Sequence, residues 1–285
     1  MVYVGSFDTY VYALNASNGS VKWKQNYTTH AMDSSPVVVN GVLYFCYEDG
    51  SVWAVNASTG VPNWVFNTFG SVDTSPAVWN GEVFVNVSGG LLALRATDGS
   101  ELWDVTSGTI QGTPVVAAGK VYVGEDESFF AVNASNGNSD WEFDLGSLDV
   151  FQATPAVANG RVYAPATDDH LYVLNSYQGS LEWMLSTHGA LASPAIANGV
   201  TYVGGADGTV YALDASTGSV LWTASTGGAI TSSPAVANGK VYVAAGDGKV
   251  YAYALPVPPP SVARPSPAQL VPDRSLRSQG SMSNR

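Results

Sequence analysis

The sequence predicts an all-β protein, a β-propeller of four-stranded antiparallel blades, and three observations support this. An eleven-residue pattern ending in Trp occurs six times, with spacings of 41, 39, 38, 42 and 39 residues between the Trp positions. A Ser/Thr-Pro pattern, such as SPAVANG at 233–239, recurs at the same spacing. Short apolar runs rich in Val and Tyr fill the space between them. A β-rich repeat of this length is typical of propellers, whose blades surround a central channel.

One period, residues 193–231, shows the four expected strands in order. Strand A lies in SPAIANG, strand B in VTYVGGADG, strand C in TVYALDASTG and strand D in SVLWTASTGG. Asn-Gly and Asp-Gly between such runs favour type I′ turns, in which both central residues have positive φ. Pro has no backbone N–H to donate to a neighbouring strand, so the Pro before strand A is typical of the start of an edge strand, here the innermost strand of the blade. The small residues beside it indicate crowding near the axis.

The count of strands predicts seven blades. Strand pairs B and C recur seven times, whereas strands A and D each occur six times, so we expect the first blade to lack A and the last to lack D. A truncated eight-bladed parent remains the alternative. We assign residues 1–255 to the propeller and expect the Pro-, Ser- and Arg-rich residues 256–285 to form a disordered tail.

The eleven-residue pattern, for example ALDASTGSVLW at 212–222, resembles the tryptophan-docking motif of the pyrroloquinoline quinone (PQQ)-repeat propellers. This resemblance implies that each indole wedges between adjacent blades. In the pattern Gly supplies the positive φ of the turn, Asn or Asp caps the turn, and Trp buries a large flat surface. A WD40 propeller is disfavoured, because Gly-His is absent and Trp-Asp occurs only at Trp103–Asp104. The expected docking residues are Trp23, Trp64, Trp103, Trp141, Trp183 and Trp222.

Composition excludes several classes of function. The net charge is −12, and an acidic body repels nucleic acid. No apolar run reaches the ~18 residues of a membrane span. Cys46 is the only cysteine, which excludes an internal disulfide and a Cys-based zinc site, and its apolar run predicts a small buried side chain. We expect a monomer.

The loops predict which face of the propeller binds a partner. In an up-and-down meander the A–B and C–D turns share one face, and the B–C and D–A loops share the other. The second set varies most from copy to copy, and loops on a rigid scaffold commonly carry function. Four apolar residues of the D–A segments are expected to supply anchors for a partner: Leu191, Leu148, Val150 and Phe151. The candidate binding residues before strand A are Asp33, Asp73, Gln111, Gln152 and Leu191, which by pseudo-symmetry should ring the channel mouth. Those in the B–C loops are Glu48, Glu125, Asp126, Glu127, Asp168 and Asp169. A merely solvated acidic rim is the alternative interpretation.

These observations favour a non-catalytic scaffold that binds a protein or peptide, with a basic partner suggested by the acidic loops. We assign no catalytic, cofactor-binding or metal-binding residue. The rival interpretation is a fragment of a quinoprotein dehydrogenase. That family implies PQQ, calcium, a catalytic Asp and typically adjacent cysteines, and the single Cys46 excludes such a pair. The resemblance also extends to outer-membrane assembly lipoproteins and surface proteins, which implies an extracytoplasmic location, although MVYVGSFDTY shows no signal peptide.

Overall fold

The computed structural model describes residues 1–255 apart from nine positions within that range. Those positions are Phe69, Asp73, Ser107, Thr109, Ser147, Leu148, Gln152, His188 and Ala190, and the side chains of Ile110 and Gln111 are also not described. The predicted tail, 256–285, lies outside the described residues. Among the described residues no helix is long and apolar enough to cross a membrane.

The described chain folds into seven antiparallel sheets whose strands follow one another in sequence order. The first blade contains β1 (Val2–Gly5), β2 (Tyr10–Leu14) and β3 (Val21–Asn26), and the second contains β4 (Val37–Val39), β5 (Val42–Cys46), β6 (Ser51–Asn56) and β7 (Pro62–Asn67). The third contains β8 (Ala77–Trp79), β9 (Glu82–Val87), β10 (Gly90–Arg95) and β11 (Glu101–Thr106). The fourth contains β12 (Ile110–Ala117), β13 (Lys120–Glu125), β14 (Ser128–Asn133) and β15 (Ser139–Asp144).

The remaining three blades repeat this order. The fifth blade contains β16 (Ala156–Ala158), β17 (Arg161–Pro165), β18 (His170–Asn175) and β19 (Leu181–Ser186). The sixth contains β20 (Ala195–Ala197), β21 (Val200–Gly204), β22 (Thr209–Asp214) and β23 (Val220–Ser225). The last contains β24 (Ala235–Ala237), β25 (Lys240–Ala245) and β26 (Lys249–Ala254). The prediction of a first blade without strand A and a last blade without strand D is confirmed.

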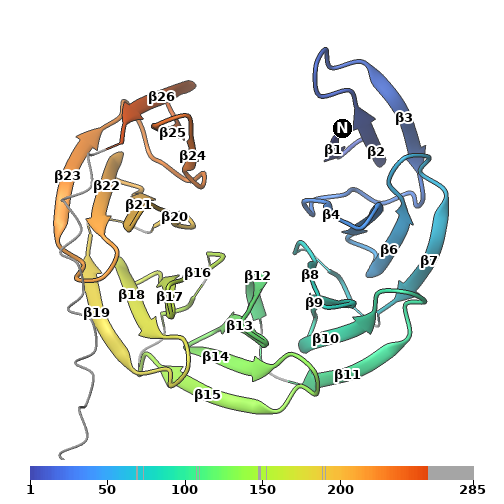
Figure 1. Ribbon diagram of the computed structural model, residues 1–285, viewed down its shortest axis with the longest axis horizontal. Helices are drawn as coiled ribbons and strands as arrows, with labels where there is room; N and C mark the ends of the chain where they lie inside the picture. The colour runs from blue at the N-terminus through green and yellow to red at the C-terminus, as the bar shows by residue number, and fades with distance from the viewer. Residues whose placement is uncertain are drawn as a thin grey trace, which may run out of the picture.

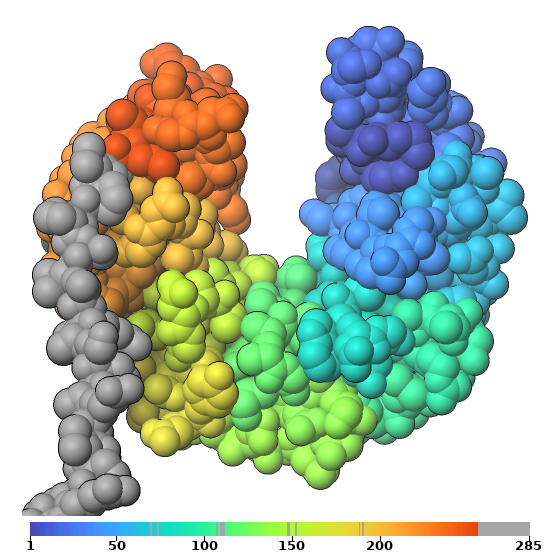
Figure 2. All heavy atoms as spheres, in the orientation of Figure 1, coloured from blue at the N-terminus to red at the C-terminus, as the bar shows by residue number. Residues whose placement is uncertain are grey.

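The blades are arranged as an open ring. Figure 1 shows the short A strands turned toward the centre and the D strands on the outside, and the ribbon stops short of closing between β26 and the first blade. The space-filling view keeps this sector open between the two ends (Figure 2). The first and last blades therefore each have one sheet face without a neighbouring blade.

The turn prediction is confirmed between strands A and B and is wrong between strands B and C. At Asn40–Gly41 both φ values are positive, +50° and +79°, as a type I′ turn requires. In the B–C loop of the second blade only Gly50 has positive φ, and the carboxylate of Asp49 instead accepts the backbone N–H of Ser51 at 2.9 Å. The loop has four residues between β5 and β6, whereas a type I′ hairpin has two. In this longer loop Asp49 caps the turn through its side chain and does not adopt a left-handed backbone conformation.

The tryptophan-docking prediction is confirmed, and the motif glycine has a second role. Trp64 Nε1 donates to the carbonyl of Ala96 in the next blade at 2.9 Å. The indole also covers Gly99 of that blade, where a Cβ would lie 2.6 Å from the ring. The same indole–glycine contact joins Trp23 to Gly60, Trp103 to Gly137, Trp141 to Gly179 and Trp183 to Gly218. The glycine thus supplies both the turn's φ and the space for the preceding blade's indole. Trp222, next to the last blade, packs instead on Tyr253 with ring centroids 5.7 Å apart.

The inner strands are linked by the hydroxyl groups that precede the recurrent Pro. The backbone N–H of Ser35 donates to Ser75 Oγ at 2.8 Å, and that of Ser75 donates to Thr113 Oγ1 at 3.4 Å. Thr113 N–H continues the series to Thr154 Oγ1 at 3.2 Å. The Ser/Thr-Pro pattern therefore connects neighbouring blades near the axis as well as fitting the limited space there.

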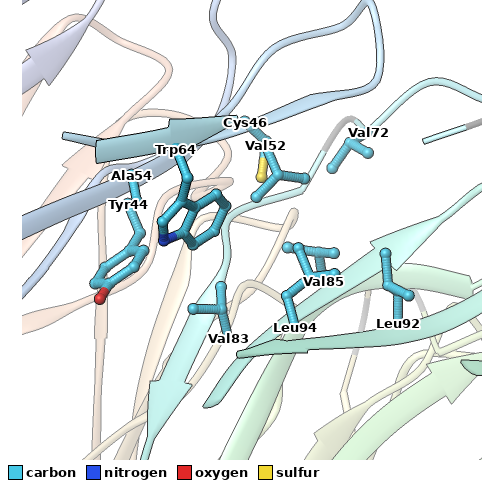
Figure 3. Packing of buried hydrophobic residues seen from close by; sticks show 10 residues of the cluster. All are labelled: Tyr44, Cys46, Val52, Ala54, Trp64, Val72, Val83, Val85, Leu92 and Leu94. Atoms are coloured by element: carbon cyan, nitrogen blue, oxygen red, sulfur yellow. The ribbon is translucent and has the colours of Figure 1, made fainter. Parts of the chain in front are cut away.

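The hydrophobic core consists of layers between successive blades. Figure 3 shows the layer between the second and third blades, where Trp64 lies across from Val83 and Leu94. Cys46 belongs to this layer and is fully buried, as predicted, and burial raises the pKa of its thiol. A buried thiol of this kind acts as a small apolar side chain.

Candidate binding face

The molecule has two distinct faces, which we call the turn face (the A–B and C–D turns) and the loop face (the B–C and D–A segments). On the turn face, Ala57 N–H of a C–D turn donates to Gly41 O of an A–B turn at 2.9 Å. On the loop face, Thr68 N–H of a D–A segment donates to Gly50 O of a B–C loop at 2.9 Å. The pairing of turns predicted from the meander is therefore confirmed.

The residues predicted to ring the channel mouth have different surroundings. Asp33 is exposed, but Leu191 is only 7 % exposed, belongs to the core between the fifth and sixth blades, and forms a β-bridge with Gly205. The prediction of Leu191 as an exposed apolar anchor is wrong, because the D–A segment turns this side chain inward. Leu191 and Thr231 line a hollow of about 370 Å³ near the axis. Asp73, Gln152 and the side chain of Gln111 lie outside the described residues, so a complete ring stays a prediction.

The other proposed apolar anchors follow the same trend. Phe151 is 1 % exposed and packs edge-on against Phe129, with ring centroids 5.2 Å apart. Its assignment as an exposed anchor is therefore wrong, since it completes the core under the loop face. Val150 is half-buried, and Leu148 lies outside the described residues.

Asp168 has a structural function in its B–C loop. Its carboxylate accepts the Tyr172 hydroxyl at 2.6 Å and the His170 backbone N–H at 3.1 Å. Burial, followed by the bond to Asp168, raises the pKa of Tyr172. The same Asp–Tyr clasp joins Asp8 to Tyr12 and Asp247 to Tyr251. Asp168 is therefore held in place inside the loop, and its role in binding stays a prediction.

Asp169 and Glu48 also take part in loop geometry. Asp169 has a positive φ of +67°, and its backbone carbonyl accepts both N–H and hydroxyl of Thr187. The backbone N–H of Glu48 donates to Ala31 O at 3.4 Å. Both side chains remain half-buried members of the loop face.

The fourth blade brings carboxylates together around a hollow on the loop face. Glu125, Asp126 and Glu127 surround it, and Glu142 from β15 completes it, giving a hollow of about 320 Å³ that also includes Ser128. Glu125 accepts the backbone N–H of Gly108, and Ser128 donates to Glu142 Oε1 at 2.8 Å. None of the ion pairs within the described part of the chain involves Glu125, Glu127 or Glu142. This acidic hollow can attract a cationic group.

Sequence reasoning missed Glu142, although a signal was present. Glu142 follows the docking residue Trp141 in strand D, outside the B–C and D–A loops that predicted the binding face. The register pairs Glu142 with Phe130 of β14, two residues beyond the B–C hairpin. Outer-strand residues one place after the docking Trp therefore lie beside the B–C loop, and their charge adds to that of the loop. Within the described residues no cluster of His, Cys, Asp and Glu has the arrangement of a metal site.

Comparisons with known proteins agree with this architecture. The family model described as outer membrane protein assembly factor BamB matches residues 1–104, 69–191 and 186–255. BamB of Yersinia pestis is 31 % identical over 188 residues, covering 64 % of this chain and 40 % of that protein. The chain thus spans less than half the length of the curated relatives that it matches. The relatives' name associates them with the outer membrane, in agreement with the expected extracytoplasmic location.

Solved structures and an enzyme also share the fold. The crystal structure of BamB from Moraxella catarrhalis superposes with a TM-score of 0.60 at 20 % identity, covering 89 % of this chain and 93 % of that one. Quinohemoprotein alcohol dehydrogenase of Comamonas testosteroni is 29 % identical over 106 residues, covering 32 % of this chain and 15 % of the enzyme. The docking motif, the seven sheets and the family match together show that this chain belongs to the BamB-like family of PQQ-repeat β-propellers.

Proposed function

We propose that this chain is a non-catalytic binding scaffold that works outside the cytoplasm and engages a basic segment of a partner protein through its loop face. The observation that carries the proposal is the acidic hollow of the fourth blade, where Glu125, Asp126, Glu127 and Glu142 converge. Relatives named as assembly factors for outer membrane proteins support a role in holding other proteins. The loop face is also the face whose sequence differs between blades.

Charge should act mainly on the rate of association. The chain carries a net charge of −12, and clustered carboxylates attract a cationic segment at long range. This attraction weakens as salt shortens the Debye length to about 8 Å near 0.15 M. We therefore expect a basic partner to associate more slowly as ionic strength rises.

The test uses the full chain and a hexalysine peptide, with hexaglutamate as the opposite-charge control. We expect salt-sensitive binding of hexalysine that weakens several-fold in the double variant Glu125→Gln, Glu142→Gln. The matched control is Asp98→Asn, Asp214→Asn, which removes the same charge from the turn face. Equal weakening by both double variants would mean that net charge alone, and no particular face, governs binding.

The alternative, a piece of a quinoprotein dehydrogenase, is tested separately. Titration of the full chain with PQQ and calcium, followed by a dye-linked alcohol oxidation assay, addresses it directly. We expect neither saturable binding at micromolar PQQ nor turnover. Saturation with turnover would replace the scaffold proposal with an oxidoreductase.

A further inference from the structure

One position on strand C distinguishes the third blade from the other six. The third residue of this strand is aromatic in every other blade: Tyr12, Trp53, Phe130, Tyr172, Tyr211 and Tyr251. In the third blade the equivalent residue on β10 is Leu92. This residue faces the preceding blade, since Leu92 packs in the layer shared with Val52 and Trp64 of the second blade.

At the equivalent interface between the fourth and fifth blades, the aromatic ring at this position, Tyr172, fills the space beneath the loop face. Tyr172 lies 5.7 Å from Phe143 of the preceding blade, measured between ring centroids, and its hydroxyl donates to Asp168. Phe66 on β7 is the counterpart of Phe143, because each stands two residues after its docking Trp. At the interface of the second and third blades, Phe66 therefore faces a leucine where its counterpart meets a tyrosine ring.

A cavity lies where Leu92 replaces the aromatic residue of the other blades. A hollow of about 520 Å³ lies between the second and third blades, within the size range of small-molecule sites. Phe66, Leu91 and Leu92 supply apolar lining, and the short Ser88–Gly89 turn forms part of the rim. Figure 3 shows Leu92 at the end of the interblade layer, beyond Leu94 and away from Trp64.

The polar lining of the hollow is acidic. Glu101 and Asp104 of β11 border it, and the register places Asp104 directly opposite Leu92. Both residues are exposed, and no ion pair within the described part of the chain involves them. A cationic group in this hollow would therefore lie near the carboxylates of Glu101 and Asp104.

We propose that this hollow binds an aromatic side chain that carries an adjacent positive charge, such as a tyrosine next to a lysine or arginine on a partner polypeptide. The aromatic residues at the position of Leu92 in the other six blades show that a ring fits in this part of the interface. Glu101 and Asp104 select a cationic neighbour over an anionic one. The site is distinct from the acidic hollow of the fourth blade, and its occupation by a small probe does not depend on the proposed function.

The probes share a phenol ring and differ in charge: tyramine is cationic, p-cresol neutral and 4-hydroxyphenylacetate anionic. Ligand-observed NMR titration of the full chain should give saturable tyramine binding with a Kd of about 1 mM, given the small size of the ligand. We expect p-cresol to bind more weakly and 4-hydroxyphenylacetate most weakly. Equal affinity for all three probes would overturn the selection for positive charge.

Three variants locate the binding. Leu92→Tyr restores the ring found at this position in the other six blades and should weaken tyramine binding by roughly tenfold or more, a free-energy change easily measured. Glu101→Gln with Asp104→Asn should weaken tyramine several-fold and leave p-cresol unchanged. Tyr172→Leu should open an equivalent hollow between the fourth and fifth blades and add a second site that binds p-cresol, because β19 carries Leu181 and Met184 at the positions of Glu101 and Asp104. This second variant keeps the proposal testable if Leu92→Tyr folds poorly.

Two results would overturn the site itself. Tyramine binding that Leu92→Tyr does not weaken would mean that the probe binds elsewhere. Phe69 stands in sequence between Thr68 and Gly70, both of which line the hollow, so the chain has a candidate ring of its own. Binding that occurs only after Phe69→Ala would show that the chain fills this site internally.

Discussion

The turn face and the loop face are built from the same strands and obey different constraints. On the turn face the motif glycines of the second to sixth blades, such as Gly99, receive the indole of the preceding blade. Carbonyls such as Ala96 O accept the N–H of that indole. These residues contact the neighbouring blade, so a change in one of them disturbs an interface. On the loop face some bonds close within a single B–C loop, as between Asp168 and Tyr172. Individual blades can therefore differ there without opening the ring.

The largest expected effect tests the indole contact on the turn face. Trp141→Ala should reduce the free energy of unfolding by about 3–5 kcal/mol, because it removes a buried aromatic side chain and the bond from Nε1 to Ser176 O. Trp222→Ala should cost less, since Trp222 covers no glycine of a following blade. Urea denaturation of both variants checks this. Equal costs would mean that the glycine contact adds nothing to stability.

A pair of glycines separates backbone conformation from packing. Gly179 and Gly19 have nearly the same φ, +68° and +70°. A Cβ at Gly179 would lie 2.5 Å from the Trp141 indole, whereas one at Gly19 would meet nothing within 4 Å. Gly19→Ala should therefore cost about 1–2 kcal/mol for the left-handed backbone alone. Gly179→Ala should cost about 1–3 kcal/mol more from overpacking.

Thermal or urea melts of the two alanine variants give the comparison directly. If Gly179→Ala and Gly19→Ala were equally destabilising, the motif glycine would serve only its backbone conformation. The interpretation of the turn face as an indole-binding surface would then be wrong.

Alkaline pH tests the buried part of the loop face. Tyr47 is fully buried, and burial raises its pKa from 10.0 to about 12. Because the folded state favours the protonated phenol, the stability that Tyr47 contributes is complete below pH 10 and is lost as pH rises from 10 toward 12. Denaturant midpoints between pH 8 and 12 measure this loss, with Tyr47→Phe as the comparison. The phenylalanine variant should lose less stability over this range, and an unchanged slope would contradict the prediction.

The smallest expected effect concerns the acidic hollow. Glu125→Gln with Glu142→Gln should change the free energy of unfolding by less than about 0.5 kcal/mol per site, as surface substitutions usually do. Asp214→Ala on the turn face should cost more, because the Asp214 carboxylate accepts the backbone N–H groups of Ser216 and Thr217. The hydrogen bond from the Ser216 hydroxyl, together with these backbone bonds, lowers the pKa of Asp214. A larger loss from the glutamate pair would show that the hollow is structural.

The spacing of the repeated residues was sufficient to predict much of this fold. The repeat predicted the blades, the incomplete first and last sheets, and the docking role of residues such as Trp64. It did so because each blade must bury the same faces against its neighbours. Glu125 and Asp126 are adjacent in sequence and border one hollow, while their role in binding stays a prediction. The prediction of apolar anchors failed for Leu191 and Phe151, whose burial depends on how the D–A segments fold over the core.

By itself the sequence determined the local chemistry that recurs: turns that need positive φ at Asn40–Gly41, and a large flat side chain at every docking position. Only the tertiary structure decided which recurring residues meet. It placed Gly99 under Trp64, brought Glu142 to the acidic hollow, and left space beside Leu92. The physical reason is that contacts between blades join residues far apart in sequence, 32 positions for Trp64 and Ala96 and 40 for Ser35 and Ser75. Their partners are set by strand register and blade packing, which no single repeat contains.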